Sequence, residues 1–327
     1  MNKHTMALYG VLLLAGLAAP FVVYPVLMMK LLCFALFACA FNLLIGYTGL
    51  LSFGHAAFLG GAGYITGYVI QSLGATPEIG ILLGTAFAAL VGLVMGWLAI
   101  RRTGIYFTMI TLALAQMLFF VWLQAPFTGG EDGLQGVPRG KLFGLLSLQD
   151  DVHLYYLVFA IFVFGFWLVR RVIHSPFGQV LQAIKENEPR AVSLGYDVNR
   201  FKLLAFVLSA ALSGLAGSTK VLVMGFETLT DAQWTMSGTV VLMTLVGGMG
   251  TLLGPVVGAF VIMILENKMG EIGSGLASVT GIEWFNQLGE SVTIVTGFIF
   301  VICVMAFRRG IVGEILVRLP KGKSSTG

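Results

Sequence analysis

Residues Gly80 to Ile100 read GILLGTAFAALVGLVMGWLAI. The stretch holds no charged residue, and its length suits a helix that crosses the hydrocarbon core of a bilayer, which takes about 20 apolar residues. A small residue recurs at every fourth position, at Gly80, Gly84, Ala88, Gly92 and Gly96. Residues four apart share one face of a helix. The pattern therefore predicts a membrane helix with a stripe of small residues along which a neighbouring helix packs closely.

The whole chain has the same apolar character. Of its 327 residues, 57% are hydrophobic and 10% are charged, whereas soluble domains carry about 25% charged residues. This composition excludes a soluble globular enzyme, and the net charge of +4 is too small and too dispersed to indicate a partner such as nucleic acid. We expect an all-α, polytopic integral membrane protein, surrounded by lipid, whose residues 1–327 form a single transmembrane domain.

Ten apolar segments are candidate membrane helices. They lie at roughly residues 6–24, 28–46, 55–73, 79–100, 105–124, 154–169, 203–224, 237–249, 251–266 and 290–307. The eighth and ninth are separate crossings only if Gly247, Gly248 and Gly250 interrupt the helix between them. A re-entrant stretch near 267–289 is the alternative for this last third of the chain.

The basic residues set the expected orientation. Pairs of arginines follow three of the apolar segments directly, at Arg101 and Arg102, Arg170 and Arg171, and Arg308 and Arg309. Segment 170–202 holds six basic residues against three acidic ones, whereas segment 126–153 holds two basic residues against four acidic ones. Short loops rich in Lys and Arg stay on the cytoplasmic side. We therefore expect 170–202 and both termini to be cytoplasmic and the loop at about 126–153 to be external.

Two glycine-interrupted stretches, one in each half of the chain, point to a solute path. They read GYTGLLSFGHAAFLGGAGYITG from Gly46 to Gly67 and VGGMGTLLGPVVG from Val246 to Gly258. Broken helices free backbone groups to meet a solute, although close helix packing is an alternative explanation of the same glycines. The candidate path residues are Asn42, Ser52, His55, Gly247, Gly248, Gly250 and Gly254. A single histidine such as His55 more often bonds a neighbouring group than a metal or a solute.

Lys220 is a basic residue deep in the seventh apolar segment. Long basic side chains in membrane helices commonly extend to the nearest interface while their methylene groups stay among apolar neighbours. We therefore expect the Lys220 ammonium group to reach the outer interface.

Segment 174–202 reads HSPFGQVLQAIKENEPRAVSLGYDVNRFK and is too polar to cross the membrane. Apolar residues lie at helical spacing on both sides of Pro189, which predicts two short helices separated by a break. An amphipathic hairpin of this kind suits the docking of a second protein, and a helix that lies on the lipid surface is the alternative. The chain contains no GxxxxGK[ST], HExxH or GxSxG motif, so we expect no catalytic residues, and its three cysteines form no CxxC pair, so we expect no metal site.

Four stretches together resemble the permease subunits of ABC importers for branched-chain amino acids, of the LivM type. They are GYTGLLSFGHAAFLGGAGY (Gly46 to Tyr64), TGGEDGLQGVP (Thr128 to Pro138), IKENEPRAVSLGYDVNRFKLLAFVLSAALSGLAG (Ile184 to Gly217) and LVGGMGTLLGPVVGA (Leu245 to Ala259). The four occur in the family's order and the resemblance covers nearly the whole chain. Lys220 departs from this resemblance, because the family has what looks like an apolar or small residue at that position.

The resemblance implies a multi-pass subunit in the inner membrane of a bacterium. Its partners would be a paralogous permease subunit, two ATP-binding subunits and an external solute-binding protein. ATP and Mg would be bound by the partner ATPase subunits and no cofactor by this chain. By the same resemblance the ATPase-coupling residues would be Gly178, Ala183, Glu186, Asn187, Glu188, Ala191 and Gly195.

The expected cargo is leucine, isoleucine, valine or a similar apolar amino acid. The same type of importer carrying urea or short amides is an alternative, because related permeases resemble this sequence too. A stand-alone secondary carrier or channel is a further alternative, but a carrier needs its own coupling-ion site, and the sequence offers no convincing one.

Overall fold

The structure is a computed structural model that describes residues 3–21, 23–144, 146–280, 297, 298, 301, 305 and 310–318. The first half forms α1 (Lys3–Ala18), the 3-10 turn η1 (Ala19–Phe21), α2 (Pro25–Thr48), α3 (His55–Leu73), α4 (Pro77–Ala99) and α5 (Ile105–Gln124). The second half forms α6 (Asp151–Ile173), α7 (Pro176–Glu186), α8 (Glu188–Ser193), α9 (Val198–Met224), α10 (Leu229–Ala232), α11 (Trp234–Gly247), α12 (Gly254–Thr280) and α14 (Gly310–Arg318).

Short strands and turns lie between these helices. After α5 come the 3-10 turns η2 (Pro126–Thr128) and η3 (Gly130–Asp132) and the strands β1 (Leu134–Gln135), β2 (Lys141–Leu142) and β3 (Leu146–Ser147), and β4 (Phe226–Glu227) follows α9. Strand β1 pairs antiparallel with β4, with Leu134 opposite Glu227, and β2 pairs antiparallel with β3. The predicted external loop is therefore folded against the end of α9.

Five of the described helices are long and apolar enough to cross a membrane, namely α2, α4, α5, α6 and α9. Residues Gly10–Phe21 and α11 are shorter apolar helices, and α3 occupies the predicted segment 55–73. These helices confirm the prediction of an all-α polytopic membrane protein. The predicted segment 290–307 lies mostly outside the described residues, so ten crossings stay a prediction.

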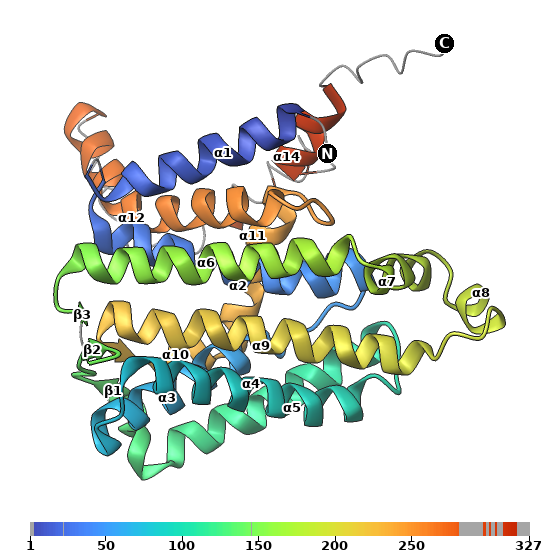
Figure 1. The fold of residues 1–327 in the computed structure, drawn as a ribbon, viewed down its shortest axis with the longest axis horizontal. Coiled ribbons are helices and arrows are strands. Elements are labelled where there is room, and N and C mark those ends of the chain that lie inside the picture. The colour runs from blue at the N-terminus through green and yellow to red at the C-terminus, as the bar shows by residue number, and fades with distance from the viewer. Residues whose placement is uncertain are drawn as a thin grey trace.

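Helix α2 forms the centre of the bundle. Every residue from Leu31 to Leu44 is buried, because α2 packs against α6, α9, α11 and α12. The long helices run roughly parallel, with α1 and α12 on one side of α2 and α4 and α5 on the other (Figure 1). Helices α4, α5 and α6 expose large apolar side chains, including Leu82, Met117 and Phe164, as expected of surfaces in contact with lipid.

The stripe of small residues on α4 lies against α9 and α3. A Cβ atom at Gly92 would contact Ala210, and one at Gly96 would lie 2.9 Å from atoms of Leu203 and Phe206. At the next turns Ala88 faces Gly214, and Gly84 faces Thr66 and Ser218, while Gly80 faces Ile70. The absence of larger side chains at these positions lets the backbones of α4 and α9 approach closely.

A break separates α11 from α12. Helix α11 ends at Gly247 and α12 begins at Gly254, which is where the sequence predicted the interruption. Gly248 and Gly250 adopt positive φ angles of 123° and 78°, a conformation that other residues rarely adopt. Helix α12 continues to Thr280, past the predicted end at 266, so the first part of the proposed re-entrant stretch is helical. The rest of that stretch lies outside the described residues.

The two polar regions lie at opposite ends of the bundle. Strands β1, β2 and β3 lie at one end, and α7 and α8 project beyond the other (Figure 1). This separation agrees with the prediction that segments 126–153 and 170–202 lie on opposite sides of the membrane.

Candidate functional site

Asn42 holds the loop between α11 and α12 against α2. Its side-chain nitrogen Nδ2 donates a hydrogen bond to the carbonyl oxygen of Thr251 (2.9 Å), and its oxygen Oδ1 accepts one from the backbone N–H of Gly250 (2.9 Å). Asn42 is 2% exposed, so both bonds are shielded from water. Gly46 lies one turn further along α2, and a Cβ there would lie 2.9 Å from the Gly250 nitrogen. Asn42 thus satisfies the backbone groups that the helix break leaves free.

The path candidates in and next to the loop between α11 and α12 are closely packed glycines. A Cβ atom at Gly247 would collide with the carbonyl oxygen of Gly254, and one at Gly254 would collide with that of Gly248. Gly248 in turn lies beside Gly310 at the start of α14. In this structure, therefore, these glycines bring α11, α12 and α14 into contact.

His55 is buried at the start of α3 and links three helices. Its ring nitrogen Nε2 lies 2.8 Å from the hydroxyl oxygen of Ser209 on α9, and that hydroxyl donates to the carbonyl oxygen of Ala40 on α2 (2.6 Å). Because the Ser209 proton is already used, Nε2 carries the proton and donates to Ser209. The ring is surrounded edge-on by three aromatic side chains, those of Phe41, Phe58 and Phe206. The partner of His55 is thus a hydroxyl group on another helix.

Ser52 organises the turn that leads into α3. Its hydroxyl oxygen accepts from the backbone N–H of Gly54 (3.1 Å). Ser237 of α11 accepts from the backbone N–H of Ala56 (2.9 Å) and donates to the carbonyl oxygen of Phe53 (2.8 Å). Ser237 was not singled out from the sequence, because it is a single serine in an apolar helix and its partners are about 180 residues away.

The path candidates therefore form two groups. Asn42 lies with the loop between α11 and α12, whereas Ser52 and His55 lie where the start of α3 meets α9 and α11. Both groups are closed by direct hydrogen bonds, and none of their residues lines the apolar cavity described below. In this conformation they connect helices around α2.

Lys220 lies in a buried cluster of charges, so the expectation that it reaches the outer interface is wrong. Its ammonium nitrogen Nζ lies 2.5 Å from Oδ2 of Asp231 and 3.5 Å from Oε2 of Glu227. The three side chains are 5%, 8% and 0% exposed. Two carboxylates at these distances take the place of water around the ammonium group, so the Lys220 side chain does not extend to the interface.

The surroundings of this charge cluster (Lys220, Glu227 and Asp231) are also tightly packed. A Cβ at Gly63 of α3 would lie 2.5 Å from the carboxyl carbon of Glu227, so α3 approaches the cluster without a side chain between them. Next to Gly63, the ring of Tyr64 stacks on Trp122 of α5 at 5.6 Å. Among the described residues, Oε1 of Glu227, the Tyr64 hydroxyl and Nε1 of Trp122 find no hydrogen-bond partner. The cluster joins α9, β4 and α10 next to α3.

The sequence signal for this cluster is a lysine followed by two acidic residues beyond the helix end. Helix α9 ends at Met224, and Glu227 and Asp231 follow it by three and seven residues. Reversal of the chain after α9 is needed to bring them back to Lys220, and that reversal depends on the pairing of β4 with β1. Within the described part of the chain, no group of three His, Cys, Asp or Glu side chains is placed to hold a metal ion.

The predicted helix–break–helix in segment 174–202 is present as α7 and α8. The break falls at Asn187, two residues before the predicted break at Pro189, which lies inside α8. The Asn187 side chain accepts from the backbone N–H of Arg190 at the N-terminus of α8. A small apolar core of Ile184, Ala191 and Val198 closes the hairpin. Glu188 pairs with Lys202 at the start of α9 (2.7 Å). The α7–α8 hairpin is therefore a folded unit attached to α6 and α9.

The residues proposed for ATPase coupling divide into exposed and interior ones. The exposed ones are Ala183, Glu186, Asn187 and Gly195, and Glu188 is partly exposed. Gly178 and Ala191 are buried within the hairpin, and the Ala183 carbonyl oxygen accepts from the Asn187 N–H (3.0 Å).

Three apolar side chains on the hairpin surface had not been proposed as coupling residues. Val192, Leu194 and Tyr196 are 57%, 68% and 42% exposed, and we call them the hairpin tip. Val192 and Leu194 are among the apolar residues at helical spacing after Pro189, and the structure leaves them uncovered.

Lys185 connects the hairpin to the centre of the bundle. Its ammonium nitrogen donates to the carbonyl oxygen of Gly46 near the end of α2 (2.6 Å), and its methylene carbon Cγ lies beside Gly49. Gly46 is also the residue that lies against Asn42 and Gly250. The hairpin, α2 and the loop between α11 and α12 are thus in contact through a short series of residues.

Comparison with known proteins places the chain among transport proteins. It is 25% identical over 251 residues to the high-affinity branched-chain amino acid transport system permease protein LivM of Escherichia coli (strain K12), which covers 70% of this chain and 59% of the relative. It is 24% identical over 230 residues to the probable branched-chain amino acid transport permease protein LivM of Methanocaldococcus jannaschii, with 64% and 63% covered. The autoinducer 2 import system permease protein LsrC of Klebsiella pneumoniae is 30% identical over 192 residues, with 56% and 53% covered.

These matches each span less than two thirds of the relative's length, and no solved structure matches the chain significantly. A family model described as the permease component of the branched-chain amino acid transport system matches residues 25–304, which include all four of the sequence stretches that carried the resemblance. The chain therefore belongs to the family of branched-chain amino acid transport system permease components.

Proposed function

We propose that this chain is the membrane-spanning subunit of an ATP-driven ABC importer that carries branched-chain amino acids inward across the bacterial inner membrane. In this proposal the chain works with a paralogous permease subunit, two ATP-binding subunits that bind ATP and Mg, and an external solute-binding protein. As a permease component the chain is a transport subunit and not an enzyme. The observation that carries the proposal of an ATPase partner is the folded α7–α8 hairpin with its exposed apolar tip.

The hairpin suits a protein partner better than a lipid surface. It projects beyond the end of the bundle (Figure 1). Its exposed residues include Leu194 and Val192 together with charges of both signs, such as Glu186 and Arg190, whereas helices that lie on membranes carry mainly basic residues beside their apolar face. Apolar side chains surrounded by charged ones are typical of an interface with another protein.

The contacts of Lys185 give the proposed coupling a physical basis. A rigid-body movement of the α7–α8 hairpin acts on the Gly46 carbonyl through the Lys185 hydrogen bond, and Gly46 lies against the loop that Asn42 holds. Interfaces packed this closely shift between discrete arrangements and do not deform gradually. We infer that ATPase movement reaches the helix break between α11 and α12 by this series of contacts.

Branched-chain amino acids are the favoured cargo because of the family and of the relatives that bear this name. The LivM relative of Escherichia coli is named for branched-chain amino acid transport, and it is matched over a larger share of this chain than LsrC, which is named for autoinducer 2 import. The second candidate cargo is therefore a small polar molecule such as autoinducer 2, with urea or short amides as a further alternative from the sequence.

The test is uptake of labelled solute into vesicles that hold this chain together with the subunits encoded beside it. We expect leucine uptake that requires both ATP and the ATP-binding subunits. Uptake of urea or autoinducer 2 under the same requirement, without leucine uptake, would overturn the cargo. Uptake of any solute that continues without the ATP-binding subunits would overturn the ATP-driven mechanism.

A charged residue introduced at the hairpin tip is expected to prevent this chain from binding its ATPase. Leu194→Glu places a carboxylate where we propose an apolar contact, and burial of an unpaired charge is strongly unfavourable. We expect ATP-dependent uptake to fall at least tenfold and the ATPase to be lost from the purified complex, with the amount of chain in the membrane unchanged. Leu146→Glu is the matched control, because Leu146 is 50% exposed at the other end of the bundle. Equal ATPase retention in both variants would contradict the docking assignment.

Orientation can be measured with single cysteines in a chain whose Cys33, Cys39 and Cys303 are replaced by alanine. Gln149 and Ser193 are exposed at opposite ends of the bundle. We expect Gln149→Cys to react with a membrane-impermeant thiol reagent in intact cells, and Ser193→Cys to react only after the membrane is opened. The reverse result would show that the hairpin is external.

A further inference from the structure

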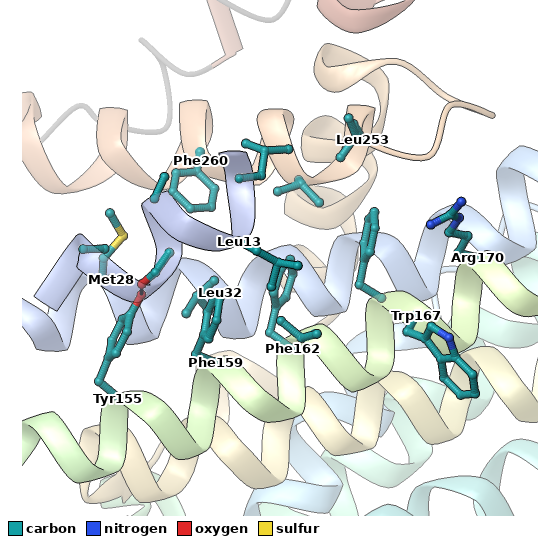
Figure 2. A pocket seen from close by; sticks show the side chains of 17 residues that line it. Leu13, Met28, Leu32, Tyr155, Phe159, Phe162, Trp167, Arg170, Leu253 and Phe260 are labelled. Atoms are coloured by element: carbon teal, nitrogen blue, oxygen red, sulfur yellow. Dashed lines mark hydrogen bonds between the residues drawn. The ribbon is translucent and has the colours of Figure 1, made fainter. Parts of the chain in front are cut away.

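A cavity of about 380 Å³ lies between α1, α2, α6 and α12, a size within the range of ligand sites. Its walls are almost entirely apolar. Figure 2 shows Phe159 and Phe162 of α6 facing Leu13 of α1 and Phe260 of α12, with Leu32 of α2 at the back. We call this cavity the α1–α6 slot. An apolar cavity in a membrane protein, next to helices that face lipid, is accessible to molecules dissolved in the bilayer.

The two ends of the slot differ in chemistry. At the end near the predicted external loop, the Tyr155 hydroxyl donates to the carbonyl oxygen of Gly16 (2.6 Å), which joins α6 to α1. At the other end the slot is lined by Arg170, with Trp167 one turn before it (Figure 2). Arg170 lies at the end of α6 that leads into the α7–α8 hairpin. The slot therefore has a closed apolar end and a basic end.

The dimensions of the slot suit a flexible chain. From Tyr155 to Arg170 the helix rises about 22 Å, which exceeds the roughly 15 Å half-thickness of the hydrocarbon core. An elongated slot lined by apolar side chains suits an acyl chain. A zwitterionic amino acid is less suited, because its ammonium group would find no acidic side chain among the lining residues.

We propose that the α1–α6 slot binds an anionic glycerophospholipid of the cytoplasmic leaflet, with an acyl chain between Phe159 and Phe162 and the headgroup phosphate at Arg170. Arg170 offers several guanidinium N–H donors, and basic residues between membrane helices on the cytoplasmic side bind anionic headgroups. Trp167 lines the slot one turn before Arg170, and tryptophan is enriched at membrane interfaces. The proposal rests on the proposed orientation, in which Arg170 is cytoplasmic, and it is independent of the cargo.

The bound lipid would also support the contact between α1 and the bundle. Helix α1 lies at the edge of the bundle (Figure 1), and two hydrogen bonds join it to α6, from the Tyr155 hydroxyl to the Gly16 carbonyl oxygen and from the Tyr156 hydroxyl to the Leu17 carbonyl oxygen. Both anchors lie at the Tyr155 end of the slot. An acyl chain that fills the slot would add apolar contacts to α1 along the remaining length.

The test counts lipids on the full-length chain, extracted in mild detergent with the subunits that accompany it, by native mass spectrometry during titration with phosphatidylglycerol or phosphatidylcholine. We expect one tightly bound phosphatidylglycerol, and phosphatidylcholine bound at least tenfold more weakly. Arg170→Gln is expected to reduce the affinity for phosphatidylglycerol about tenfold, to the level of phosphatidylcholine. Arg171→Gln is the matched control, because Arg171 is the adjacent residue and does not line the slot.

A second pair of variants tests the acyl-chain site. Val163→Trp fills the slot and is expected to abolish binding of both lipids, whereas Phe164→Trp, at a neighbouring position that is 54% exposed, is expected to leave binding unchanged. Leu13→Trp fills the slot from α1 and replaces Val163→Trp if that variant does not fold. Lipid binding that survives both filling variants, or that falls equally in Arg170→Gln and Arg171→Gln, would overturn the site.

Two further outcomes distinguish the alternatives. A mass that corresponds to two copies of this chain, reduced to one by Val163→Trp, would show that a second copy covers the slot and would overturn the lipid. If the chain binds the lipid but takes up no leucine, the proposed cargo is contradicted and the lipid site is supported. Failure of the site and failure of the proposed function are therefore read from different measurements.

Discussion

Lys220→Met is expected to cause the largest loss of stability of any single charge removal considered for this chain. The substitution leaves Glu227 and Asp231 buried without their cation, and removal of one partner from a buried ion pair costs about 3–5 kcal/mol. We expect little folded protein in the membrane and a strongly lowered midpoint of thermal unfolding for what remains. Size-exclusion chromatography of a fluorescent fusion after stepwise heating measures both quantities.

The control for Lys220→Met is Arg200→Met in the same helix. Arg200 pairs with Asp197 at 2.8 Å, but the two side chains are 83% and 52% exposed, so the pair contributes less than about 1 kcal/mol. The triple variant Lys220→Met, Glu227→Gln, Asp231→Asn removes all three charges and is expected to recover much of the lost stability. An unfolding midpoint for Lys220→Met equal to that of Arg200→Met would show that the charge cluster is open to water in the membrane.

Gly217→Leu is expected to separate α9 from α3 and to prevent correct folding. A Cβ atom at Gly217 would collide with the carbonyl oxygen of Leu59, and its distance to the Leu59 carbonyl carbon would be 2.7 Å. These are backbone atoms, so the helices themselves must move apart to admit a side chain. Overpacking of this kind costs about 1–3 kcal/mol or more, and a leucine adds further atoms to the contact. The yield of monodisperse protein and its unfolding midpoint are the measurements.

Gly238→Leu provides the comparison for Gly217→Leu. Gly238 also lies in an apolar helix, α11, but no atom lies within 4 Å of a Cβ built there. Both substitutions make the same change in composition and in intrinsic helix propensity. A similar loss of stability in the two variants would contradict the close packing of α9 against α3.

The helices of the first two thirds of the chain could be predicted closely from sequence. The predicted segment 55–73 has the same bounds as α3, and 105–124 the same as α5. Glycines mark these helix ends, Gly54 and Gly74 for α3 and Gly104 for α5, so the local sequence was sufficient to place them. The break between α11 and α12 was predicted for a similar reason, because Gly248 and Gly250 favour positive φ angles.

The charge cluster and the exact partners of the polar residues could not be predicted. The expectation for Lys220 considered its own helix, whereas its partners return to it through a turn whose position depends on β1, about 90 residues earlier. The hydrogen bond between His55 and Ser209 joins residues 154 positions apart. Such contacts depend on how α2, α3 and α9 pack together, which no local pattern specifies.

The hairpin was predicted in outline because its pattern is local, but its surface was not. Apolar spacing on both sides of Pro189 indicated two short helices that pack together. The same spacing does not show which apolar residues face inward, since Ala191 lies in the hairpin core while its neighbour Val192 is 57% exposed. The ion pair between Glu188 and Lys202 likewise depends on how α8 lies against α9.

Because β1 pairs with β4, two distant parts of the sequence form one structural unit. The backbone N–H of Val137 donates to the Gly225 carbonyl oxygen (2.8 Å), and the Arg139 guanidinium donates to that of Val223 (3.3 Å). A chimaera that exchanges only the loop before α6 with that of a relative would keep a β4 strand whose sequence fits a different β1, next to the buried charges. Exchange of this surface between permeases therefore requires that the loop before α6 and the turn after α9 be exchanged together, and substitutions in one should be accompanied in evolution by substitutions in the other.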